Sequence, residues 1–221
     1  TLPLTLFPYT TLFRSHDTPR RLEKDETISI VFDLDQIAYR IVKGHKIRLS
    51  ISNSYWPLLW PTPDKGEIEI VEGSIEIPVI NSSIENTRNF LPEKTDEPWK
   101  NETLREASNS RKVTRDIGSD DSILEIIDDF GLVRDLKHGL EIGSIAREWW
   151  SIHPDDPLSA EGKTHWTEER SRGAWKTRTE TYAKMNSDAE NFYIYAKLEA
   201  YENEILFFEK EISETISRDS H

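Results

Sequence analysis

The stretch Gly44–Pro61, GHKIRLSISNSYWPLLWP, decides how the rest of the chain is interpreted. In its first half, apolar residues alternate with polar ones, and this period of two is typical of a half-buried β-strand. Its second half gathers aromatic residues and prolines, which predicts a surface that packs against another domain or holds a ligand. The candidate residues of that surface are Tyr55, Trp56 and Trp60.

The same stretch resembles the end of the C-terminal β-domain of the X-prolyl dipeptidyl-peptidase and cocaine-esterase class of acyl hydrolases. In that family a G-H-[RK]-[IV]-R-[LV] strand precedes a Ser-rich loop with aromatic residues and prolines, and Gly44–Leu49 fills the strand pattern. Glu67–Val79 resembles the two closing strands of the same domain. Four later motifs resemble an extension found in some members: VTRD at Val113–Asp116, DDFG at Asp128–Gly131, GLEIG at Gly139–Gly143 and HPDDPLSA at His153–Ala160.

The resemblance implies an all-β fold, in which the closing strands of a jelly-roll-like sandwich precede a second antiparallel β-unit. We expect the sandwich part at 16–80, a polar linker at 81–110 and the β-rich extension at 111–221. The implied function is that of a non-catalytic C-terminal fragment of a serine acyl hydrolase. The parent enzyme would hydrolyse an ester or an X-prolyl amide through an acyl-serine intermediate.

The catalytic domain of that family is an α/β-hydrolase and requires a G-x-S-x-G nucleophile elbow. No G-x-S-x-G occurs in this sequence, so we expect no catalytic residue, no cofactor and no activity of the chain alone. The expected partners are the missing N-terminal α/β-hydrolase domain and further copies of the chain. The alternative function is a stand-alone β-sandwich module that binds a carbohydrate or a lipid on its Trp-rich surface.

The first fifteen residues, Thr1–Ser15, do not begin with Met, and Thr5–Ser15 resembles the conceptual translation of a sequencing adapter. We expect this leader to be an assembly artefact rather than a natural start. The alternative is a short apolar strand.

Composition sets the remaining expectations. The net charge of −13 disfavours nucleic acids and anionic membranes as partners, and no apolar run approaches the roughly 18 residues of a membrane helix. The sequence contains no cysteine, which excludes disulfides and fits a cytoplasmic protein.

Alternation predicts further strands at Glu26–Phe32, Glu67–Val71 and Ser74–Ile80. In the extension it predicts strands at Lys112–Ile117, Ile123–Ile127, Leu132–Asp135, Gly139–Ile152, Thr164–Arg170, Ala174–Met185 and Asn191–Glu202. Two turns are expected inside it, at Asp128–Gly131 and Ser171–Gly173. Because adjacent strand residues point to opposite faces, the pair Trp149-Trp150 requires cover on both faces.

The segment 203–216 is ambiguous, because its apolar residues recur with a helical period while the residues before it alternate strictly. Two strands joined by a turn near Glu202-Asn203 are favoured, and a helix is the alternative.

Other candidate residues favour structural roles. His45 could act as a general base, but packing or a hydrogen bond to a nearby carbonyl explains it better. The acidic pairs Asp33/Asp35, Asp128-Asp129 and Asp155-Asp156 lie in predicted turns and lack a calcium-binding loop pattern, so we expect no metal site.

Overall fold

The structure, a computed structural model, describes residues 23–29, 31, 39–64, 66–80 and 90–218. All regular secondary structure in these residues belongs to one antiparallel sheet, which confirms the all-β class. Its strands are β1 (Asn101–Arg105), β2 (Ser108–Arg115), β3 (Ser122–Asp135), β4 (Glu141–His153), β5 (Asp156–Arg172), β6 (Trp175–Ser187), β7 (Asn191–Glu202) and β8 (Ile205–Ser217).

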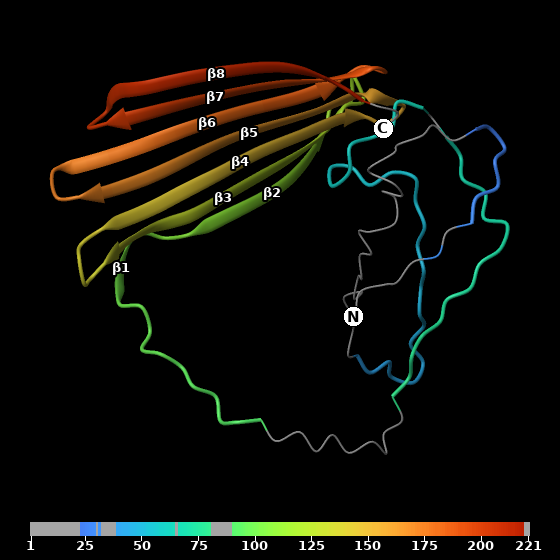
Figure 1. Ribbon diagram of the computed structural model, residues 1–221, viewed down its shortest axis with the longest axis horizontal. Helices are drawn as coiled ribbons and strands as arrows, with labels where there is room; N and C mark the ends of the chain where they lie inside the picture. Colours follow the sequence, from blue (N-terminus) through green and yellow to red (C-terminus); the bar gives the residue numbers. More distant parts are fainter. Residues whose placement is uncertain (1–22, 30, 32–38, 65, 81–89, 219–221) are drawn as a thin grey trace.

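The sheet is a meander in which each strand from β3 to β8 pairs with the next one in the sequence (Figure 1). Both β1 and β2 pair with β3 and form one edge, and β8 forms the other. This architecture confirms the predicted second antiparallel β-unit. The described part of the N-terminal half lies beyond one end of the strands (Figure 1).

The turn between β7 and β8 decides the ambiguous segment in favour of strands. Asn203 and Glu204 have φ angles of 48° and 64°. Two consecutive positive φ values match the right-handed twist of the flanking strands, and Asn tolerates this conformation well. The predicted turn near Glu202-Asn203 is therefore confirmed, and Ile205–Ser217 is a strand rather than a helix.

The predicted turn at Asp128–Gly131 is wrong, because β3 runs without interruption through it. The segment forms a bulge instead, with a register shift against β4 between Asp129 and Leu132. Gly131 has a φ of 83°, and a Cβ on it would lie 2.6 Å from the carbonyl oxygen of Arg105. The glycine thus supplies a positive φ and a close backbone approach, which are needs of a bulge as well as of a turn.

The sheet begins at Asn101, inside the segment expected to be linker. Just before it, Trp99 Nε1 donates a hydrogen bond of 2.7 Å to Asp135 Oδ2 at the end of β3. Trp99 therefore fixes this segment to the sheet. Phe90 and Leu91 do not, since they are 82% and 88% exposed.

The strands predicted in the N-terminal half are wrong for the residues described. No strand occurs in the described parts of Glu26–Phe32, in Gly44–Ser52 or in Glu67–Ile80. Ile47, Leu49 and Ile51 alternate as expected, yet each is more than half exposed. Alternation defines a face, but a strand also requires neighbouring strands that accept its backbone hydrogen bonds.

The two faces of the sheet differ in chemistry. Residues directly opposite each other on neighbouring antiparallel strands share a face. One such row is apolar: Trp150, Gly162, Met185 and Ile194. The next row along the strands lies on the other face and is polar: Trp149, Lys163, Lys184 and Tyr195. We call these the apolar face and the charged face of the sheet.

Candidate domain-docking site

The aromatic cluster is held in shape by a tight turn. The Leu59 amide donates a 2.9 Å hydrogen bond to the carbonyl oxygen of Tyr55, and the Trp56-Pro57 peptide bond is cis. This turn brings the rings of Trp56 and Trp60 to 5.0 Å between centroids, at an interplanar angle of 85°. Edge-to-face contact of this kind is the preferred geometry of aromatic pairs. The two indoles therefore form one unit.

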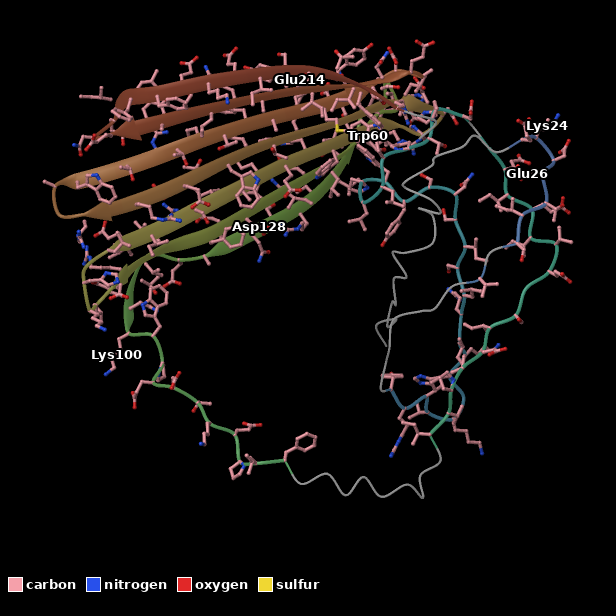
Figure 2. The ribbon with its side chains drawn as sticks, viewed as in Figure 1. Lys24, Glu26, Trp60, Lys100, Asp128 and Glu214 are labelled. Atoms are coloured by element: carbon pink, nitrogen blue, oxygen red, sulfur yellow. The ribbon has the colours of Figure 1, made fainter. Side chains whose placement is uncertain are left out.

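This unit packs on the apolar face at one end of the sheet (Figure 2). Trp56 contacts Trp150 of β4 edge to face, with ring centroids 5.7 Å apart. Trp60 contacts Phe192 of β7 in the same way at 6.1 Å. Each such pair contributes about 0.5–1.5 kcal/mol beyond the area that it buries. The cluster thus bridges strands that lie three positions apart in the sheet.

Two hydrogen bonds fix the position of the cluster. Trp60 Nε1 donates to Ser187 Oγ at 2.9 Å, and Arg218 Nη2 donates to the carbonyl oxygen of Pro61 at 2.6 Å. Ser187 ends β6 and Arg218 follows β8, so both partners come from the sheet. These bonds satisfy polar groups that the aromatic contacts remove from water.

Arg218 is the most deeply buried charged residue of this site, with 2% of its surface exposed. Its Nη1 donates to Ser187 Oγ and to the carbonyl oxygen of Asp188, and its guanidinium lies 4.6 Å from the Phe192 ring centroid. The pKa of Arg218 is lowered, because the effect of burial outweighs the negative charge of Asp188, which acts to raise it. The planar guanidinium group of arginine can donate several hydrogen bonds and can also stack on an aromatic ring. It therefore suits a site that combines carbonyl oxygens with a phenyl ring.

The structure places the three candidate residues of the sequence in one half-buried turn, and it adds four residues that the sequence analysis did not include. These are Trp150, Ser187, Phe192 and Arg218. The requirement for cover at Trp149-Trp150 is the one signal that pointed here. It is confirmed on the apolar face, where Trp150 contacts Trp56; on the charged face Trp149 Nε1 donates a hydrogen bond of 3.1 Å to Glu125 Oε2 of the neighbouring strand.

Gly162 of β5 makes room for the Trp150 ring. It lies directly opposite Trp150 in the register of β4 and β5. A Cβ at this position would lie 2.6 Å from Cζ3 of the indole. The missing side chain therefore allows Trp150 to lie flat over β5, where Trp56 can contact it.

The charged face holds a dense polar network centred on Glu180. Its Oε2 accepts a 2.7 Å hydrogen bond from Thr167 Oγ1 and lies 2.7 Å from His165 Nε2, and its Oε1 accepts from Arg178. Burial alone would raise the pKa of Glu180, but these hydrogen bonds outweigh it and hold the pKa below its ordinary value. The hydroxyl of Thr167 donates to the carboxylate and not to His165, so the group lacks the order of a nucleophile–base–acid triad.

The other candidate residues of the sequence have ordinary structural contacts where they are described. The His45 amide bonds the carbonyl oxygen of Val42 in a turn that contains Gly44, with a φ of 91°. Asp128 and Asp129 bind Arg111 and Arg105. Asp33 and Asp35 lie outside the described residues.

Two general findings concern the part of the chain that the structure describes. It contains no group of three or more His, Cys, Asp or Glu residues arranged to hold a metal ion. It also contains no helix with the length and apolar character needed to cross a membrane.

Comparison with known families identifies the segment that contains the aromatic cluster. Residues 10–113 match the model of the X-Pro dipeptidyl-peptidase C-terminal non-catalytic domain, which confirms the resemblance noted in the sequence. This part of the chain is therefore similar to the non-catalytic C-terminal domain of X-Pro dipeptidyl-peptidases. The match ends inside β2, so most of the sheet lies after it. No curated protein and no solved structure matches the chain.

Proposed function

We propose that this chain is the non-catalytic C-terminal part of a serine acyl hydrolase, and that its sheet is a scaffold on which the family domain docks. The observation on which this proposal rests is the contact of Trp56 and Trp60, inside the matched segment, with Trp150 and Phe192, outside it. The chain contains no G-x-S-x-G, so hydrolysis of an ester or an X-prolyl amide would belong to a separate α/β-hydrolase domain of the same protein.

The exposed apolar residues of the N-terminal half support this proposal. Ile47, Leu49 and Ile51 alternate with polar residues. Of their residue surfaces, 58%, 58% and 57% are exposed, respectively. Apolar residues exposed at this regular spacing are consistent with a face that another domain covers. We propose that the remainder of a jelly-roll-like sandwich, or the catalytic domain, covers it.

The boundaries at residues 15, 80 and 110 and the cytoplasmic location stay predictions. They rest on the sequence patterns and on the absence of cysteine.

The first test reads the genomic sequence upstream of the codon for His16. An open frame that continues upstream and encodes G-x-S-x-G supports the proposal. A start codon close to His16 contradicts it and favours the stand-alone binding module.

The second test measures turnover of a p-nitrophenyl ester and of an X-Pro anilide by the purified chain. We expect no turnover, because no nucleophile elbow is present. Turnover that a single Ser→Ala substitution abolishes would show a catalytic serine in this chain and overturn the proposal.

The alternative function, a stand-alone module that binds a carbohydrate or a lipid, is less well supported. The indoles of the cluster already contact other side chains of this chain. Trp60 donates its only N–H to Ser187, and its ring contacts two other rings. A platform for a sugar would instead present an open aromatic face to solvent.

A further inference from the structure

Within the residues that the structure describes, no strand pairs with the outer edge of β8. Twelve of its thirteen residues oppose residues of β7 on one side, and all thirteen are exposed (Figure 1). Natural proteins seldom leave a long edge strand open, because its free N–H and C=O groups form a template for another strand. The question is which strand fits this edge.

A bulge limits the regularly paired part of β8 to ten residues. The register between β7 and β8 shifts by one residue at Phe207, which opposes no residue of β7. From Phe208 to Ser217 the pairing is continuous, and Ile212 lies next to the middle of this segment. A strand of this kind can pair antiparallel with a copy of itself about a two-fold axis that passes through one of its residues.

The charges of this segment divide between the two faces. Glu209 and Glu211 lie on the charged face, where Lys197 of β7 is 3.2 Å and 3.7 Å from their carboxylates. Lys210 and Glu214 lie on the apolar face, opposite Leu198 and Ile194. Among the residues described, neither of these two has an ion-pair partner, and Glu214 marks the open edge in Figure 2.

We propose that two copies of this chain associate through β8, in antiparallel register with Ile212 on the two-fold axis. Lys210 of each copy then lies opposite Glu214 of the other, which gives two cross-strand ion pairs. Phe208 lies opposite Ile216 at both ends, and Ile212 lies opposite itself. Opposite-charge and apolar pairs directly across antiparallel strands are both stabilising.

Neighbouring registers are less favourable. The apolar faces of the two sheets stay on the same side only if even-numbered residues of the segment pair with even-numbered ones, which requires the axis to pass through a residue. An axis at Glu211 places two like charges opposite each other, and an axis at Lys210 does the same. An axis at Ser213 places Lys210 opposite Ile216 and Ile212 opposite Glu214.

This inference does not depend on the proposed function, because it concerns an edge outside the family domain. It predicts a continuous sheet through the dimer, with the apolar faces of both copies on one side. The occupant is therefore a second copy of this chain, and its recognition rests on the pattern of charges along one strand.

Disulfide trapping tests the register, since the chain has no native cysteine. We expect Ile212→Cys to form a covalent dimer under mild oxidation, because directly opposed Cα atoms lie about 4.5–5.5 Å apart, within disulfide range. Ile216→Cys alone is the matched control and should stay monomeric under denaturing conditions. A mixture of Phe208→Cys and Ile216→Cys chains should give the mixed dimer.

Charge reversal tests the ion pairs by sedimentation equilibrium of the full chain. Lys210→Glu and Glu214→Lys should each weaken dimerisation about 2- to 30-fold, and the double variant should restore it. Circular dichroism of each variant checks that the strands are retained.

Three outcomes overturn the proposal. The first is a chain that is monomeric at every concentration. The second is a dimer in which Ile212→Cys does not cross-link. The third is a dimer that is insensitive to both reversals, which would indicate stacking of the apolar faces instead of edge pairing.

Discussion

The indole nitrogen of Trp60 donates a hydrogen bond of 2.9 Å to Ser187 Oγ, although 127 residues separate the two in the sequence. Ser187 also accepts a hydrogen bond from Arg218, so one hydroxyl joins the aromatic turn to the ends of β6 and β8. This contact connects the segment matched by the family model to the sheet that follows it. The stability of the docked arrangement should therefore depend on a few side chains.

Replacement of Trp60 should loosen the docked turn. We expect Trp60→Ala to lower the free energy of unfolding by about 2 kcal/mol, which is less than for a fully buried aromatic residue because Trp60 is half-buried. Trp60→Phe keeps the ring but not the N–H and should cost about 1 kcal/mol. Urea unfolding followed by circular dichroism measures both. Trp175→Ala, at an exposed position next to the β5–β6 turn, is the control and should change stability little.

Replacement of Arg218 by lysine should destabilise the docked turn. Lysine keeps the charge but lacks the planar fork that reaches Pro61, Ser187 and Asp188 together. We expect Arg218→Lys to cost about 2 kcal/mol and to speed proteolysis within residues 55–61, since release of the half-buried turn exposes its backbone. The exposed Arg172→Lys is the matched control. Equal proteolysis of both variants would show that Arg218 does not hold the turn.

The free energy of unfolding should fall in acid, because protonation of Glu180 removes the interactions of its carboxylate. Its folded-state pKa is lowered, so the stabilisation is fully present above the unfolded pKa near 4.5 and is lost as the pH falls through the lower folded value. Glu180→Gln should therefore flatten the dependence of unfolding free energy on pH between about pH 5 and pH 3. The exposed Glu106→Gln, between β1 and β2, serves as control. An unchanged slope in Glu180→Gln would contradict the assignment.

Gly162→Ala should disturb the site through Trp150. The added methyl group would overlap the indole, and overpacking of this kind costs about 1–3 kcal/mol. We also expect a change in tryptophan fluorescence, because Trp150 must shift against Trp56. Gly73→Ala, where nothing lies within 4 Å of the added Cβ, should leave both quantities unchanged.

The local alternation of residues, together with turn signals, was sufficient to predict most strands of the sheet. Strict alternation from Asn191 to Glu202 and a turn at Asn203 define β7 and β8 as they occur. At Asp128–Gly131 the same rules predicted a turn, and the structure has a bulge. A glycine with positive φ suits both, and only pairing with β4 distinguishes them.

The sequence by itself determined the all-β class, the family resemblance at Gly44–Leu49 and the residues of the aromatic turn. These depend on the side-chain period and on short motifs, both of which are local. Only the tertiary structure decided that the turn docks on β4 and β7, that Arg218 closes it, and that the described residues before 80 do not form the expected strands. Each of these depends on partners far away in the chain, because a strand or a buried cation is stable only where another segment satisfies its hydrogen bonds.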